Sequence, residues 1–122
     1  MKAKNGEHLV TLRLILSPSA VIGPGKVALL EAIGETGSIS AAGRQHGMSY
    51  KRAWHLVEAL NSYFTTPLVE TSKGGKSGGG AALTDLGRDV IAAYRGIEDE
   101  ARTTAKPHTR RLRRHLRVSD DG

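Results

Sequence analysis

Glycines and lysines crowd one short run, Thr71–Leu83, which reads TSKGGKSGGGAAL. Its Gly-Lys-Ser ends like a phosphate-binding nucleotide loop, whose full pattern is a glycine, any four residues and then Gly-Lys-Ser/Thr. The position of the first glycine holds Glu70, and the run leads into Ala-Ala-Leu, which favours a strand over a helix. We therefore interpret it as a glycine-rich hairpin tip, whose Lys73 and Lys76 lie against phosphate. The alternative is a disordered hairpin tip that contacts no phosphate or orders only on DNA.

Two other kinds of chemistry are not supported by the spacing of the residues. The segment Gly23–Ala28 matches the glycine pattern of dinucleotide-binding folds, but those folds need repeated strand-helix-strand units, and the next 40 residues read as helical. The five histidines are scattered and there is no cysteine, so we expect no metal site. We also expect no catalytic residues and no cofactor.

Charge is distributed unevenly along the 122 residues, whose net charge is +6. Residues 1–101 hold 11 Lys/Arg and 10 Asp/Glu, whereas residues 102–122 hold 7 and 2. We expect one domain at 9–105, preceded by a frayed N-terminus at 1–8. The basic end, 106–122, is expected to be a flexible tail, disordered or only partly helical. With no signal peptide or membrane span in the pattern, the protein is expected to be soluble and cytoplasmic.

Apolar periodicity and breakers outline the elements that must position these residues. Alternation predicts a strand at 9–16, and Pro and Gly predict a loop at 17–25. A helix follows at about 26–36 and stops at Gly37, and Ser40 is a plausible N-cap for a short second helix. The remaining expected elements are a third helix at about 50–64 capped by Ser49, two short strands at 68–71 and 81–83, and a fourth helix at about 85–103 capped by Thr84.

This order predicts a fold that is mainly α with a small β wing, a winged helix-turn-helix with a long C-terminal helix. The B-form major groove admits one α-helix, so the third helix is the candidate reader of DNA. Placing Ala53 at the core turns Lys51 and His55 outward, with Tyr50 and Arg52 on opposite flanks. The expected DNA-binding residues are Ser40, Ser49, Tyr50, Lys51, Arg52, His55, Lys73 and Lys76.

Several of these residues also have a purely structural interpretation. Ser40 and Ser49 can be helix caps and nothing more, although one hydroxyl can cap a helix and meet a phosphate. A Lys-Arg pair on an amphipathic helix is often only a solvated face. Ser38 and Arg44 are weaker candidates for a DNA contact, and Trp54 is expected to be buried against a neighbouring element.

Two segments together, GSISAAGRQHGMSYKRAWHLVEALN (37–61) and LVETSKGGKSGGGAALTDLG (68–87), resemble the DNA-binding domain of ModE-type molybdate-responsive regulators, which are distantly LysR-like. The resemblance covers about residues 20–100. It implies a homodimeric transcription regulator that binds double-stranded DNA at a palindromic operator. It also places the eight candidate residues near DNA.

The resemblance leaves one part of that family unmatched. Full-length members carry C-terminal domains that bind molybdate, whereas these residues end in an arginine-rich segment. We therefore expect a regulator that lacks the molybdate-sensing domains. The alternative is a winged-helix protein–protein interaction module whose basic tail binds nucleic acid without specificity.

Overall fold

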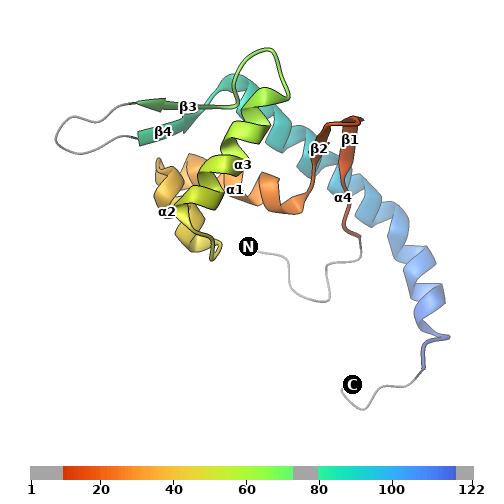
Figure 1. The fold of residues 1–122 in the computed structure, drawn as a ribbon. Coiled ribbons are helices and arrows are strands. Elements are labelled where there is room, and N and C mark those ends of the chain that lie inside the picture. Colours follow the sequence, from red (N-terminus) through yellow and green to blue (C-terminus); the bar gives the residue numbers. More distant parts are fainter. Residues whose placement is uncertain (1–9, 73–79, 118–122) are drawn as a thin grey trace.

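The computed structural model describes residues 10–72 and 80–117, and Figure 1 shows their path. In chain order the elements are β1 (Leu14–Ser17), β2 (Ala20–Ile22), α1 (Pro24–Thr36), α2 (Ile39–Gln45), α3 (Tyr50–Ser62), β3 (Val69–Ser72), β4 (Gly80–Leu83) and α4 (Asp85–Arg113). The fold is a winged helix-turn-helix, mainly helical with two small antiparallel hairpins, as the sequence predicted.

An antiparallel hairpin, β1–β2, occupies residues 14–22. Its first strand confirms the end of the strand predicted at 9–16, and its second strand lies inside the loop predicted at 17–25. Leu14 pairs with Ile22, and Ile15 pairs with Val21. The loop prediction was wrong because Pro and Gly near both ends concealed a three-residue strand. In that strand the buried Ala20 and Ile22 alternate with the half-buried Val21, which is the period of a strand with one covered face.

Helix α1 forms the centre of the core. It begins at Pro24, two residues earlier than predicted, because proline suits the first helical position, where no N–H is needed. It ends at Gly37, whose φ of 72° is left-handed and whose N–H donates to the Ile33 carbonyl at 2.8 Å. Its buried residues are Val27, Leu29, Leu30, Ala32 and Ile33.

The next two helices form the helix-turn-helix. Ser38, and not Ser40 as predicted, caps α2, because its hydroxyl accepts from the Ala41 N–H at 3.0 Å. The helix therefore starts at Ile39, two residues before the prediction allowed. Between α2 and α3 the chain turns at Gly47, where φ is 67°.

The wing is the hairpin of β3 and β4, with Val69 opposite Leu83 and Ser72 opposite Gly80. Asn61 of α3 fixes its start, because the side-chain oxygen accepts from the N–H groups of Leu68 and Val69 while the amide nitrogen donates to the Val69 carbonyl. The wing is thereby attached to α3. The expected contacts Lys73 and Lys76 lie outside the described residues.

Helix α4 is longer than predicted. Thr84 caps it as expected, accepting from the Gly87 N–H at 3.0 Å, but it continues through Pro107 to Arg113. A proline removes one backbone hydrogen bond without always ending a helix. The arginines in the last turn also stabilise the helix, because their positive charges lie near the partial negative charge at its C-terminal end. Residues 106–113, assigned from the sequence to a flexible tail, are therefore helical.

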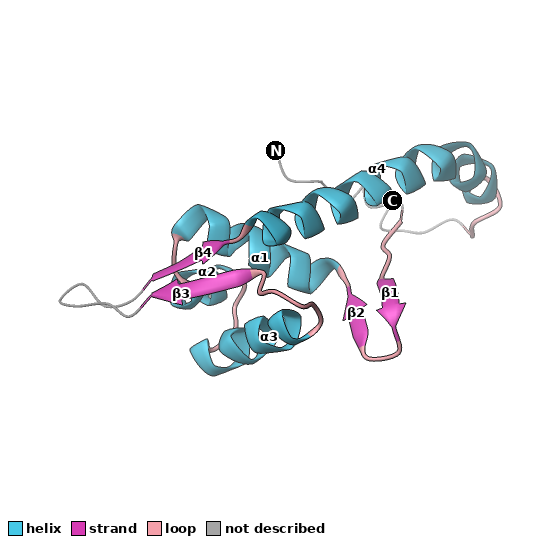
Figure 2. Ribbon diagram, turned by 90° about the horizontal axis from the view of Figure 1, so that it is seen from above, coloured by secondary structure: helices cyan, strands magenta, loops and turns pink. Residues whose placement is uncertain are grey.

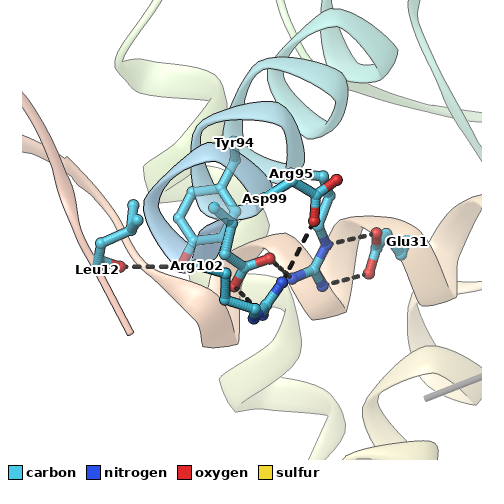
Figure 3. A network of polar contacts seen from close by, with 7 residues as sticks. Leu12, Glu31, Tyr94, Arg95, Asp99 and Arg102 are labelled. Carbon is cyan, nitrogen blue, oxygen red and sulfur yellow. Dashed lines mark hydrogen bonds and ion pairs between the residues drawn. The ribbon is translucent and has the colours of Figure 1, made fainter. Parts of the chain in front are cut away.

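Helices α3 and α4 pack on opposite sides of α1, as the view from above shows (Figure 2). A polar network attaches α4 to α1 and to the chain before β1 (Figure 3). Arg95 donates to both carboxylate oxygens of Glu31 at 2.7 and 2.9 Å and to the buried Glu98 at 2.8 Å, while the Tyr94 hydroxyl donates to the Leu12 carbonyl at 2.8 Å. In the described part of the chain, no helix is long and apolar enough to cross a membrane.

Candidate nucleic-acid interface

The opening turns of α3 form an exposed polar strip. The Ser49 hydroxyl caps the helix by accepting from the Arg52 N–H at 3.1 Å, as predicted. Three buried residues, Ala53, Val57 and Leu60, hold the opposite face in the core. The side chains of Tyr50, Lys51, Arg52 and His55 are consequently all exposed. Each can donate a hydrogen bond to a phosphate or to a base edge.

Four of the predicted residues lie together on one shallow surface at the start of α3, namely Ser49, Lys51, Arg52 and His55. We call this surface the reading strip. It lies along the first turns of one helix, and the major groove of B-form DNA admits one α-helix. The structure thus turns Lys51 and His55 outward, as the helical projection predicted, and places Ser49 and Arg52 beside them.

Tyr50 lies apart from that group, on the flank that faces the wing. Its ring stacks on Trp54 with centroids 6.4 Å apart and planes 18° apart. Both rings help to line a hollow of about 280 Å³ between α2, α3 and the wing, which we call the wing-side groove. Trp54, expected to be buried, is half-buried there.

Ser40 lies in the same wing-side groove and does not cap a helix. Its hydroxyl accepts from the Arg44 guanidinium at 2.9 Å, so the two form an exposed polar pair one turn apart on α2. Sequence reasoning missed two hydroxyl residues on this side, Thr71 and Ser72 of β3. Their only signal in the sequence was their place at the start of the glycine-rich run.

A second hollow, of about 540 Å³, lies on the other flank of α3. It is bounded by Arg52 and Leu56 of α3, by Gly23 and Lys26 around the start of α1, and by Arg13 just before β1. We call it the hairpin-side groove. Arg52 thus faces this groove while Tyr50 faces the other, and the predicted placement on opposite flanks is confirmed.

Positive charge on α3 has no counter-ion in the described part of the chain. No ion pair or side-chain hydrogen bond forms at Lys51 or Arg52 among residues 10–72 and 80–117. Arg95, by contrast, forms ion pairs with the carboxylates of Glu31 and Glu98. The hydrogen bonds that Arg95 donates to the Glu31 carboxylate are the main cause that raises the pKa of Arg95 above the ordinary arginine value. The paired arginine is structural, and the unpaired cations on α3 are available to an anion.

Metal chemistry finds no support among the residues that the structure describes. They contain no group of three His, Asp or Glu side chains placed to hold an ion. His55 is exposed on the reading strip, where an imidazole serves as a hydrogen-bond donor or acceptor.

Residues 25–88, more than half of the chain, match the model of the bacterial regulatory helix-turn-helix proteins of the lysR family. The chain belongs to this family. The matched span runs from the first turn of α1 to the first turn of α4, so it contains the reading strip and both strands of the wing.

Curated relatives confirm the ModE-like character of this winged helix. The chain is 56% identical over 79 residues to the molybdenum-pterin-binding protein MopB of Rhodobacter capsulatus, covering 65% of this chain and 29% of MopB. It is 40% identical over 95 residues to the transcriptional regulator ModE of Haemophilus influenzae, covering 78% and 36%. The chain therefore spans about a third of the length of these relatives.

Solved structures of other regulators share the fold. The DNA-binding domain of CbnR, in a complex with DNA, superposes with a TM-score of 0.56 at 19% identity over 72% of this chain and 95% of that one. Full-length CbnR with its target DNA gives 0.53 at 20% identity over 70% of this chain and 28% of that one. At such identity the likeness concerns the fold alone.

Proposed function

We propose that this chain is the sequence-specific DNA-binding part of a transcription regulator of the molybdate-responsive, ModE-type class, and that it is not an enzyme. The observation that carries the proposal is the reading strip. Its donors and unpaired cations open the second helix of a helix-turn-helix, on the face that α1 and α4 leave exposed. Family membership supports the same role. The site of action is the cytoplasm, where bacterial DNA is read.

Within the strip, Lys51 and Arg52 read base edges, while Ser49 and His55 contact the backbone or the groove walls. Ser40 and Tyr50, in the wing-side groove, contact the backbone beside the strip. A bidentate contact to guanine discriminates against the wrong base by about 1–3 kcal/mol. Lys73 and Lys76, in the segment between β3 and β4, act on phosphates. Substituting either should weaken binding to all sequences alike.

The chain acts as a homodimer on a palindromic operator. Apolar side chains exposed on α4 support this part of the proposal, since Ile97 is 43% exposed and Leu112 is 59% exposed. Ile15 at the β1–β2 hairpin, 71% exposed, offers a second surface for association. Two reading strips about 34 Å apart would then enter successive major grooves.

Molybdate is sensed outside these 122 residues in this proposal. The names of several relatives refer to molybdenum, but the chain corresponds to only about a third of their length. A thermal unfolding series with a large excess of sodium molybdate should therefore show no shift beyond that given by sodium sulfate at equal ionic strength.

Selection of bound duplexes from a random pool tests the proposal. The expected product is an inverted repeat whose half-sites lie one helical turn apart, bound with a stoichiometry of two chains per duplex. A pool that yields no enriched sequence would reject sequence-specific recognition. It would favour the interaction module with a basic, non-specific α4 terminus.

A further inference from the structure

The hairpin-side groove is basic and has no role in the sequence-based account. Three cations from three elements line it: Arg13 from the segment before β1, Lys26 from α1 and Arg52 from α3. No Asp or Glu is among the described residues that line it. We propose that this groove holds the DNA backbone on the flank of α3 opposite the wing, with Arg13 as its principal phosphate contact. The inference rests on the proposed function.

The position of Arg13 is set by the hairpin and by a glycine. Its side chain lies across Gly23, because a Cβ built on Gly23 would lie 3.4 Å from the Arg13 Cγ and 3.9 Å from its Nε. The preceding residue, Leu12, is bound through its carbonyl by the Tyr94 hydroxyl at 2.8 Å. Arg13 is thus exposed but attached at its backbone to the body of the protein.

Lys26 positions the groove and is not its free cation. Its ammonium donates to the Val21 carbonyl at 2.9 Å and to the Tyr63 hydroxyl at 2.5 Å, and it lies 4.9 Å from the centroid of the Tyr63 ring. These contacts join β2, α1 and the end of α3. The guanidinium groups of Arg13 and Arg52 make no hydrogen bond or ion pair within residues 10–72 and 80–117, so they remain for a ligand.

The arrangement of the whole face explains why the ligand would be duplex DNA. The wing lies to one side of α3 and the β1–β2 hairpin to the other, in both views (Figures 1 and 2). A helix in the major groove has one phosphate strand on each side. Arg52 and Leu56 border both the reading strip and the hairpin-side groove, so the two surfaces are continuous. A backbone strand leaving the strip would therefore pass Arg13.

The test compares Arg13→Gln with the wild-type chain on the duplex that the wild type selects. A matched control is Arg88→Gln, another exposed arginine, which pairs with Asp85 on α4. We expect Arg13→Gln to weaken binding roughly threefold to tenfold, equally for selected and scrambled duplexes, and to reduce the salt slope by about one unit. Arg88→Gln should change neither.

A scan with single neutral methylphosphonates locates the contact. At one or two positions per half-site, on the strand away from the wing, Arg13→Gln should cause no further loss, because the partner charge is already absent. The inference is overturned if Arg13→Gln binds as tightly as the wild type, or if it loses the same affinity whichever phosphate is neutralised. In either case, a wild-type chain that still selects a sequence leaves the proposed function intact. A wild-type chain that binds no duplex overturns both.

A free oxyanion such as inorganic phosphate is the other candidate ligand of this groove, because it offers the same negative charge and hydrogen-bond acceptors as the DNA backbone. Thermal unfolding of the free chain in sodium phosphate should match that in sodium chloride of equal ionic strength. Stabilisation by phosphate that Arg13→Gln abolishes would assign the groove to a small anion and overturn the assignment to DNA.

Discussion

Tyr94 joins burial and hydrogen bonding in one side chain. It is fully buried, and its hydroxyl donates to the Leu12 carbonyl (Figure 3). Burial is the main cause that raises its pKa above the ordinary value of 10.0, and the negative charge of Glu98 adds to it. The folded protein therefore holds this phenol neutral where an unfolded chain would ionise it.

The sign of the pH dependence follows from that shift. Stability from Tyr94 is fully present below the ordinary pKa of 10.0 and is lost as the pH rises toward and through the raised value. Tyr94→Phe should cost about 1 kcal/mol at neutral pH, because the Leu12 carbonyl loses its donor. Above pH 10 the variant should lose stability less steeply than the wild type.

Urea unfolding at neutral and alkaline pH measures both effects. Tyr50→Phe is the control, since Tyr50 is 57% exposed and should alter neither value. An alkaline slope in Tyr94→Phe equal to that of the wild type would show that another group dominates the alkaline loss.

At the scale of elements, α4 is held where it meets the wing by a close backbone approach. A Cβ on Gly87 would lie 2.3 Å from the Leu68 carbonyl oxygen. That oxygen also accepts from the Thr84 N–H at 2.9 Å and from its hydroxyl at 3.2 Å. Only glycine lets the first turn of α4 lie against the start of β3 in this way.

Gly87→Ala should destabilise the fold by about 1–3 kcal/mol, because the added methyl forces the helix away from Leu68. Gly96→Ala is the matched control on the same helix, where an added Cβ meets nothing within 4 Å. There alanine should stabilise the helix by about 0.5–1 kcal/mol. Chemical unfolding of both variants decides the matter, and equal effects of the same sign would contradict the packing described for Gly87.

Attachment of the wing to α3 belongs to the same scale. The three hydrogen bonds of Asn61 connect the last turn of α3 to Leu68 and Val69. The orientation of β3 is therefore coupled to that of α3.

At the scale of the whole molecule, the sequence predicted the order of the helices and the face of α3 that is exposed. The apolar residues in and just after α3 are spaced by four, three and four positions, at Ala53, Val57, Leu60 and Phe64. This spacing was enough to place Lys51 and His55 outward. It also put Tyr50 and Arg52 on opposite flanks, which both grooves confirm.

What local rules missed depends on contacts between distant residues. The β1–β2 hairpin is covered on its inner side by the core, so Ala20 and Ile22 are buried despite the prolines around them. Only Ser40 was predicted as the cap of α2, whereas the helix begins two residues earlier, at the buried Ile39, and is capped by Ser38. Arg13 gave no sign of a binding role, because its groove exists only when β1, α1 and α3 come together.

The end of α4 was predicted to be a flexible tail because of its basic composition, yet the helix continues through Pro107 to Arg113. Arg95, Glu98 and Arg102 link successive turns of α4 before Pro107, at distances of 2.8 and 3.6 Å. A helix already formed by such contacts continues past one missing hydrogen bond. A prediction from the types of the residues after position 105 contains no information about the ion pairs in the preceding turns of the helix.

The central claim is that α3 faces the duplex and α4 faces away from it. Because the chain has no cysteine, single cysteines carrying a DNA-cleaving iron chelate can report each surface. Glu58→Cys marks the exposed side of α3, and Glu100→Cys, with the same change of charge, marks α4. On the selected duplex, we expect the reagent at position 58 to cut within each half-site, in clusters one helical turn apart. The reagent at position 100 should cut weakly or not at all. Strong cleavage from position 100 with none from position 58 would contradict the account.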